Sequence, residues 1–201
     1  MRNLILFLVL AGAGILAWVI LGRPDKKESV EKTEAIAVSK HSTAFNESVA
    51  AVLNDYNTIA ENFVKWDSAA SATAASTLIK NLENVKLEEL KKDSSAIYET
   101  AVMFINNAKG DAQTIATEPT IRPQREAFNS MTDNLYQFLN TVNYDGQTLY
   151  LQECPMAFDD TKSAIWLSQK EEIRNPYLGL YHPHYGKGML ACGENKTKIE
   201  N

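Results

Sequence analysis

The chain has 201 residues, a length that supports one domain built around a single hydrophobic core. Its 9 glycines and 6 prolines exclude a collagen-like or low-complexity chain, and no segment repeats at the period of a solenoid. The net charge of -5 argues against nucleic acid as a partner. Two cysteines are too few for a disulfide scaffold, and they fit either one bridge or one sulfur-containing metal site.

The N-terminal segment has the composition of a membrane-spanning helix. Residues 4–21 are all apolar or glycine, and such a helix would span roughly 27 Å of hydrocarbon. Arg2 precedes this run, and no small-x-small cleavage pattern follows it. We therefore predict that residues 1–22 form an uncleaved transmembrane anchor. A cleaved signal peptide is the main alternative, and a buried core helix is a weaker one because a small acidic domain has no place for a helix that is apolar all round.

The charges beside this segment leave its orientation open. The positive residues that follow it outnumber Arg2, and the positive-inside rule would then place the body in the cytoplasm. A short N-terminal tail carrying Arg2 is also typical of a secretory signal-anchor. Residues 23–40 alternate in charge without an apolar stripe, which predicts a solvated linker.

Residues 41–143 carry apolar side chains at steps of three and four, which predicts four amphipathic helices. Asp67 is the expected N-cap of the second helix, and Pro123 is expected in the first turn of the fourth. Short connections favour an all-α fold with an up-down-up-down four-helix bundle. We expect Met103 and Met131 to be core residues without a cofactor role. The predicted core includes Phe45, Val52, Tyr56, Phe63, Leu78, Leu82, Phe104, Leu135 and Phe138.

Residues 144–201 are expected to form an irregular tail that packs on the bundle, with at most a short strand at 148–151. Long segments without helical period are usually functional in compact domains, so the chemistry is expected here. Trp166 and Arg174 are expected to attach the tail to the bundle. His41, which precedes the first helix, is expected to be a solvated surface residue.

The tail brings a thiol and a thioether together twice, in Cys154-Pro155-Met156 and in Met189-Leu190-Ala191-Cys192. Thiolates and thioethers are soft ligands that select copper(I). We therefore predict a metal site made by Cys154, Met156, Met189 and Cys192.

Two other interpretations of these cysteines stay open. His182 and His184 lie in the same segment and would complete a zinc site with the two cysteines. Alternatively, Cys154 and Cys192 would simply form a disulfide outside the cytoplasm. A reduced pair that binds metal and an oxidised pair that does not are compatible with each other.

Four strings in the tail together resemble domain-of-unknown-function family 3347. They are LYLQECPMA at 149–157, WLS at 166–168, EIRNPY at 172–177 and MLACG at 189–193. The family occurs largely in Bacteroidetes-type bacteria, as stand-alone exported proteins and fused to periplasmic adaptor subunits of heavy-metal efflux systems. The resemblance implies a helical bundle with a cysteine and methionine tail, outside the inner membrane, linked to copper or other heavy metals. Cys154, Met156, Met189 and Cys192 lie on the shared strings, whereas His182 and His184 lie in a stretch that is longer than in many members.

Together these observations predict a single-pass inner-membrane protein whose body lies in the periplasm. Its predicted function is to bind copper(I) and to capture it or pass it on, with a heavy-metal efflux complex as a partner. The alternative is a protein-interaction domain that binds no metal and whose tail is pinned by a Cys154–Cys192 disulfide. The sequence carries no Gly-x-Ser-x-Gly, His-Glu-x-x-His or phosphate-binding glycine loop, so we do not expect an enzyme.

Overall fold

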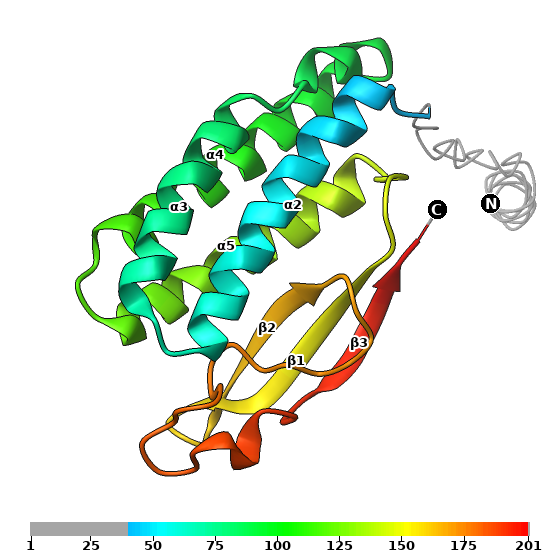
Figure 1. Ribbon diagram of the computed structural model, residues 1–201. Coiled ribbons are helices and arrows are strands. Elements are labelled where there is room, and N and C mark those ends of the chain that lie inside the picture. Colours follow the sequence, from blue (N-terminus) through cyan, green and yellow to red (C-terminus); the bar gives the residue numbers. More distant parts are fainter. Residues whose placement is uncertain (1–39, 201) are drawn as a thin grey trace, which may run out of the picture. The chain divides into compact units, whose positions relative to one another are not determined.

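A computed structural model describes residues 40–200 of the chain (Figure 1). The predicted anchor at 1–22, and all of the predicted linker except Lys40, lie outside the described residues. Within residues 40–200, no helix combines the length and the apolar character that crossing a bilayer would require.

Four α-helices form most of the described chain, as predicted. They are α2 (Thr43–Val64), α3 (Ser68–Glu83), α4 (Ser95–Thr117) and α5 (Ile121–Thr141). A 3₁₀-helix, η1 (Leu87–Lys92), joins α3 to α4. Asp67 is the N-cap of α3 and accepts a hydrogen bond of 2.8 Å from the backbone N–H of Ala70. Pro123 lies in the first turn of α5, where its missing N–H has no helical partner to lose.

The helices pack in chain order, and aromatic rings of α2 and α5 pack against each other. Phe45 of α2 lies 6.4 Å from Phe138 of α5, and Phe63 lies 5.3 Å from Phe128, so the two helices run antiparallel. Every predicted core residue is buried except Phe104, which is only partly buried. Met131 is fully buried as expected, but Met103 is 48% exposed. The expectation for Met103 was wrong because the buried stripe of α4 contains Ala101 and Ile105, on either side of it.

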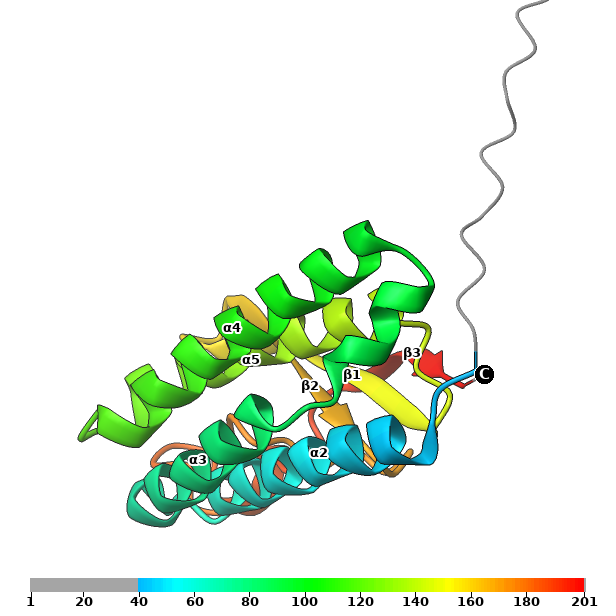
Figure 2. The same cartoon turned by 90° about the horizontal axis from the view of Figure 1, so that it is seen from above.

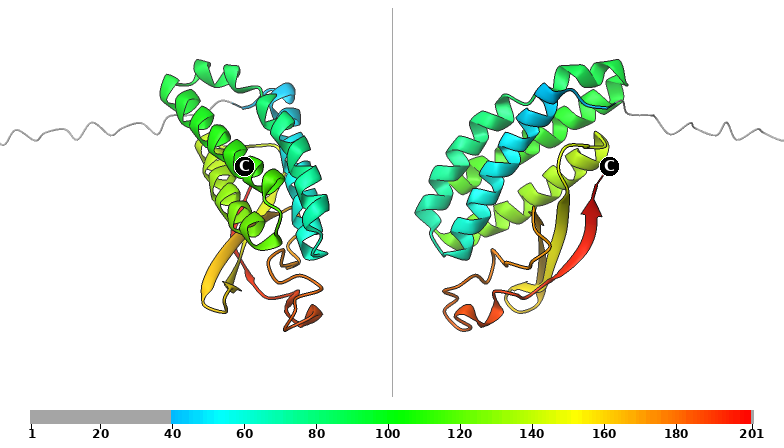
Figure 3. Two further views of the ribbon diagram at one scale, coloured as in Figure 1. Left: turned by 90° about the vertical axis from the view of Figure 1, so that its left-hand side faces the viewer. Right: turned by 45° about the vertical axis from the view of Figure 1, so that its right-hand side comes forward.

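The all-α prediction was wrong, because the tail is not irregular but contains a three-stranded antiparallel sheet. Its strands are β1 (Leu149–Phe158), β2 (Lys162–Ser168) and β3 (Glu194–Ile199), in the order β2-β1-β3. The sheet lies along the side of the bundle where α2 and α5 face each other (Figures 1 and 3). Seen from above, it lies in the opening between the α2–α3 pair and the α4–α5 pair (Figure 2).

The sequences of β1 and β3 lack the patterns by which strands are usually predicted. Leu151 and Gln152 of β1 are adjacent and both buried, so the strand does not alternate between apolar and polar residues. Pro155 also lies within β1, and because proline has no N–H to donate, its presence in a sequence argues against a central strand. β3 has five exposed residues out of six and carries no apolar period, as is common for charged edge strands. Its pairing is decided by hydrogen bonds to β1, which a local pattern does not reveal.

Two helix side chains and one tail side chain cover the free edge of β2. The backbone N–H of Ile165 donates to Oδ1 of Asn129 at 2.9 Å, and that of Leu167 donates to Oη of Tyr56 at 3.0 Å. The hydroxyl of Tyr177 donates to the carbonyl oxygen of Ile165 at 2.5 Å. Unpaired edge groups would be costly to bury and would allow pairing with another chain. The bonds from Asn129 and Tyr56 therefore anchor the sheet to the bundle.

Replacing Tyr56 by phenylalanine should lower the free energy of unfolding by about 1 to 3 kcal/mol. Tyr56 is fully buried, and its hydroxyl accepts from Leu167 and lies 2.6 Å from Oγ1 of Thr132. Because Thr132 already donates to the carbonyl of Phe128, Tyr56 is the donor to Thr132. Removing the hydroxyl leaves the N–H of Leu167 unpaired in the core, and urea unfolding measures the loss.

The matched control is Tyr98→Phe, since the Tyr98 hydroxyl donates to Glu88 at an exposed site. It should change stability by less than about 0.5 kcal/mol. Equal effects of the two variants would contradict the role assigned to Tyr56.

His41 is not the surface residue that its position suggested, because its side chain is only 2% exposed. Its Nδ1 lies 3.1 Å from a carboxylate oxygen of Glu89, and its Nε2 lies 2.8 Å from the carbonyl oxygen of Val142. The ring also stacks on Phe45 with 4.1 Å between centroids. Its two hydrogen-bond partners lie 48 and 101 residues away in sequence. The residues next to His41 therefore do not indicate that its side chain is buried.

Candidate metal site at the two cysteines

The sheet brings Cys154 and Cys192 together from positions 38 residues apart. Cys154 lies on the central strand β1 opposite Ala164 of β2. On the other side of β1, Glu153 pairs with Glu194 at the start of β3. Because antiparallel partners move in opposite directions from each pair, this register carries Cys192 back beside Cys154. The two cysteines are therefore neighbours in the fold.

Both cysteines are free thiols, with Cys154 buried and Cys192 partly buried. Burial raises the pKa of the Cys192 thiol well above its ordinary value, and the neighbouring thiol of Cys154 raises it further. Cys192 therefore keeps its proton at neutral pH, and a metal ion that binds it must displace that proton. The pair offers two soft ligands at one place.

Asn175 holds the segment that carries Cys192. It is fully buried, its backbone N–H donates to the carbonyl of Leu190 at 2.8 Å, and its Nδ2 donates to the carbonyl of Cys192 at 2.8 Å. Its Oδ1 accepts from the backbone N–H groups of Tyr177 at 2.7 Å and Leu178 at 2.9 Å. One side chain thus joins the Asn-Pro-Tyr segment to the segment that carries Cys192.

Gly193 lets the chain pass close to Trp166. Its φ of +140° is rare for residues with a side chain. A Cβ at this position would lie 2.8 Å from the carbonyl oxygen of Glu153 and 2.8 Å from the Trp166 ring. Glycine is therefore required directly after Cys192, and the fully packed ring of Trp166 forms a wall beside the site.

The two methionines flank the thiols in sequence. Met156 lies two residues beyond Cys154 on β1, and Met189 ends a 3₁₀-helix, η2 (Lys187–Met189), three residues before Cys192. Both are partly buried and pack against the hydrophobic core. Thioethers held this way are adaptable groups that adjust to a neighbouring ligand.

The histidines face a different part of the tail. Nδ1 of His182 accepts from the backbone N–H groups of His184 and Tyr185, both at 3.2 Å, and its ring packs edge-on against Trp66. Among residues 40–200, no three histidine, cysteine or acidic side chains gather in a metal-binding group. The two cysteines and two histidines therefore do not form a preassembled four-ligand site.

The tail is attached to the bundle as expected. Trp166 is 2% exposed, and Arg174 forms two hydrogen bonds of 3.0 and 2.9 Å with the carboxylate of Glu61 on α2. That guanidinium is the main cause that lowers the pKa of Glu61. The exposed ion pair itself contributes little, so burial of the tryptophan carries most of the attachment.

Sequence reasoning missed two residues. Asn175 belongs to the recognised Asn-Pro-Tyr string, but its position gave no indication of its partners. Arg125 of α5 is buried with 4% exposure. A signal for it existed, because Arg125 lies three residues before the core residue Phe128 and four after Ile121, on the apolar stripe of the helix.

The model of a family described as "Protein of unknown function (DUF3347)" matches residues 52–146. The match begins within α2 and ends before β1, so it covers the helices and not the tail strings that carried the resemblance. No curated protein and no solved structure matches the chain. The match over residues 52–146 supports the assignment of this chain to domain-of-unknown-function family 3347.

Proposed function

We propose that this chain is a metal-binding module that holds a soft ion, copper(I), at the thiols of Cys154 and Cys192. The observation that carries the proposal is the pair of free, neighbouring thiols within the tail. Thiolates select copper(I) over hard ions, and two of them suffice for its low coordination number. The thioethers of Met156 and Met189 would complete the site, and zinc is the alternative ion.

The cellular part of the proposal is a membrane-anchored module on the extracytoplasmic face that captures copper or passes it on. A partly buried Cys192 beside a fully buried Cys154 suits transfer, because an incoming ligand reaches the outer thiol first. A heavy-metal efflux complex is the proposed partner, and no catalysis is proposed. In the competing function, the same thiols form a disulfide and the tail serves only as an interaction surface.

An anaerobic titration of the reduced chain with copper(I), against a chromogenic copper(I) chelator, tests this site. We expect one ion per chain. Cys154→Ser and Cys192→Ser should each weaken binding by more than about 100-fold, because loss of an outer-shell partner alone costs 10- to 100-fold. Cys192→Ser is the more informative variant, since Cys192 is partly exposed and its replacement disturbs the core less.

The methionines need a separate variant with its own control. Met156→Leu combined with Met189→Leu keeps side-chain volume and removes both thioethers, and it should weaken copper(I) binding measurably. Met103→Leu is the matched control, because Met103 is exposed on α4, outside the tail. Binding that is unchanged in the cysteine variants contradicts the site. A disulfide mass in chains isolated without reductant, with no metal uptake after reduction, favours the interaction domain.

A further inference from the structure

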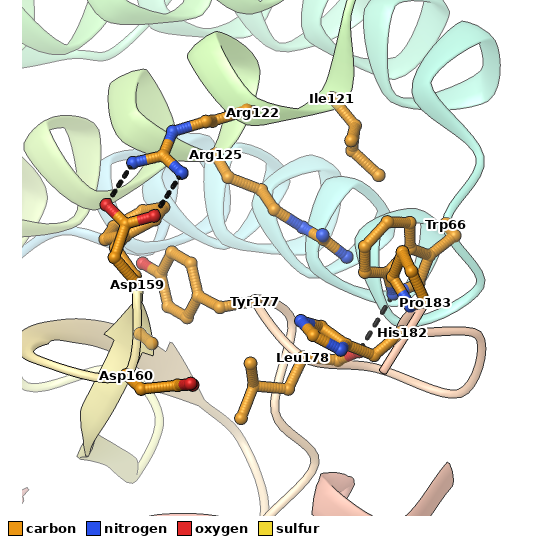
Figure 4. Close-up of a pocket in the computed structure, with 12 residues that line it drawn as sticks. Trp66, Ile121, Arg122, Arg125, Asp159, Asp160, Tyr177, Leu178, His182 and Pro183 are labelled. Carbon is orange, nitrogen blue, oxygen red and sulfur yellow. Dashed lines mark hydrogen bonds and ion pairs between the residues drawn. The ribbon is translucent and has the colours of Figure 1, made fainter. Parts of the chain in front are cut away.

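A second candidate site lies apart from the thiols, in a cavity of about 340 Å³. The cavity lies between the first turns of α5, the turn after α2, the β1–β2 turn and the segment after Tyr177 (Figure 4). Its volume is at the small end of ligand pockets. Its lining residues include Trp66, Ile121, Arg125, Leu178 and His182.

Arg125 is a buried guanidinium without a carboxylate partner. Its Nη2 donates to the carbonyl of Phe63 at 2.7 Å, whereas its buried Nε has no hydrogen-bond partner. The guanidinium lies 4.2 Å from the centre of the Trp66 ring. In the part of the chain that the structure describes, Arg122 and Arg174 each form an ion pair, with Asp159 and Glu61, and Arg125 forms none.

Burying the charge of Arg125 without an anion beside it costs free energy. Burial lowers the pKa of Arg125 to about 9, so the group still carries its charge at neutral pH. A buried charge is normally paired or bound to an ion. The ring of Trp66 and the carbonyl of Phe63 compensate for only part of its lost hydration.

His182 supplies a second donor to the same cavity. Because its Nδ1 accepts from two backbone N–H groups, the proton of the neutral ring is on Nε2. In residues 40–200, that Nε2–H has no hydrogen-bond partner. Figure 4 shows the His182 ring and the Arg125 guanidinium on the same side of the cavity, with Trp66 beside them. An anion between them would accept from both.

Other residues that line the cavity indicate the charge and the shape of the anion that would fit. Asp159 and Asp160 both line the cavity, the first paired with Arg122 and the second accepting from the Tyr185 hydroxyl at 2.8 Å. Their charges disfavour a doubly charged phosphate more than a singly charged group. A carboxylate also matches the planar fork of arginine. The apolar side chains of Ile121 and Leu178 favour an organic body on the ligand.

We propose that this cavity binds an organic monocarboxylate, whose carboxylate pairs with Arg125 and His182 and whose apolar body lies against Trp66, Ile121 and Leu178. The carboxylate belongs either to a free small acid or to the C-terminus of a peptide, since the recognised chemistry is the same. This site is independent of the copper proposal.

Titration of the unmodified full chain with benzoate, followed by NMR of arginine Nε–H and tryptophan indole N–H groups, tests the proposal. We expect saturable shifts of Arg125 Nε–H and Trp66 Nε1–H, while Arg174 stays unchanged. Benzamide, which has the same shape without the charge, should bind at least about tenfold more weakly, the effect expected from losing a charge-assisted hydrogen bond. N-acetylphenylalanine represents a peptide terminus, and tighter binding than benzoate assigns the ligand to that source.

Variants provide the second readout. Arg125→Gln should reduce benzoate affinity at least about tenfold, and Arg174→Gln, outside the cavity, should leave it within about threefold. If Arg125→Gln does not fold, His182→Phe retains a ring of similar shape, removes the Nε2–H donor and should still weaken binding. Equal binding of benzoate and benzamide, shifts that never saturate, or full affinity in both cavity variants would overturn the proposal.

Discussion

Asn175→Ala is expected to lower the free energy of unfolding by more than about 3 kcal/mol. The fully buried side chain makes three hydrogen bonds, to the backbone of Tyr177, Leu178 and Cys192. Alanine leaves these groups without their partner, and each unsatisfied buried group costs about 1 to 3 kcal/mol. Urea unfolding monitored by tryptophan fluorescence measures the loss.

The same variant should also expose the cysteine segment. Because the Asn175 side chain holds the carbonyl of Cys192, its loss should speed the reaction of Cys192 with a thiol reagent under native conditions. Asn84→Ala is the control, since the exposed Asn84 side chain bonds only to the carbonyl of Lys80 within its own helix turn. A stability change as small as that of the control would show that Asn175 does not hold the tail.

Met131→Ala is expected to cost about 2 to 5 kcal/mol, because Met131 is fully buried on α5 and its truncation leaves a cavity in the core. Met103→Ala is the matched control on α4. Met103 is 48% exposed, so its truncation should change stability by less than about 0.5 kcal/mol. Chemical unfolding of both variants under one condition compares them directly, and equal losses would mean that the two helix faces are assigned incorrectly.

The four helices followed from the sequence because their cause is local. A stripe such as Phe45, Val49, Val52 and Tyr56 repeats with the period of the α-helix, and its members meet on one face wherever the helix is placed. Asp67 caps α3 through a bond that spans three residues. Met103 shows the limit of this reasoning, since the width of a buried stripe depends on the neighbouring helices.

The sheet did not follow from the sequence because its causes are distant. β3 is almost entirely polar, and it forms a strand because β1 offers it a free edge. β2 is placed on the bundle by Tyr56 and Asn129, which lie 111 and 36 residues from their partners. Such pairings depend on the folded arrangement and leave no period in the local sequence.

The sequence by itself determined which residues have soft-metal chemistry: two thiols and two thioethers lie in one tail, and a ligand type is a property of the side chain. Only the tertiary structure decided that Cys154 and Cys192 are neighbours, because the register of β1 with β3 and the bonds of Asn175 bring them together. It also decided that Arg125 is a buried charge without a carboxylate, since partners of a charge come from other elements of the fold. Side-chain chemistry is local, whereas proximity and burial are set by contacts between residues far apart in the chain.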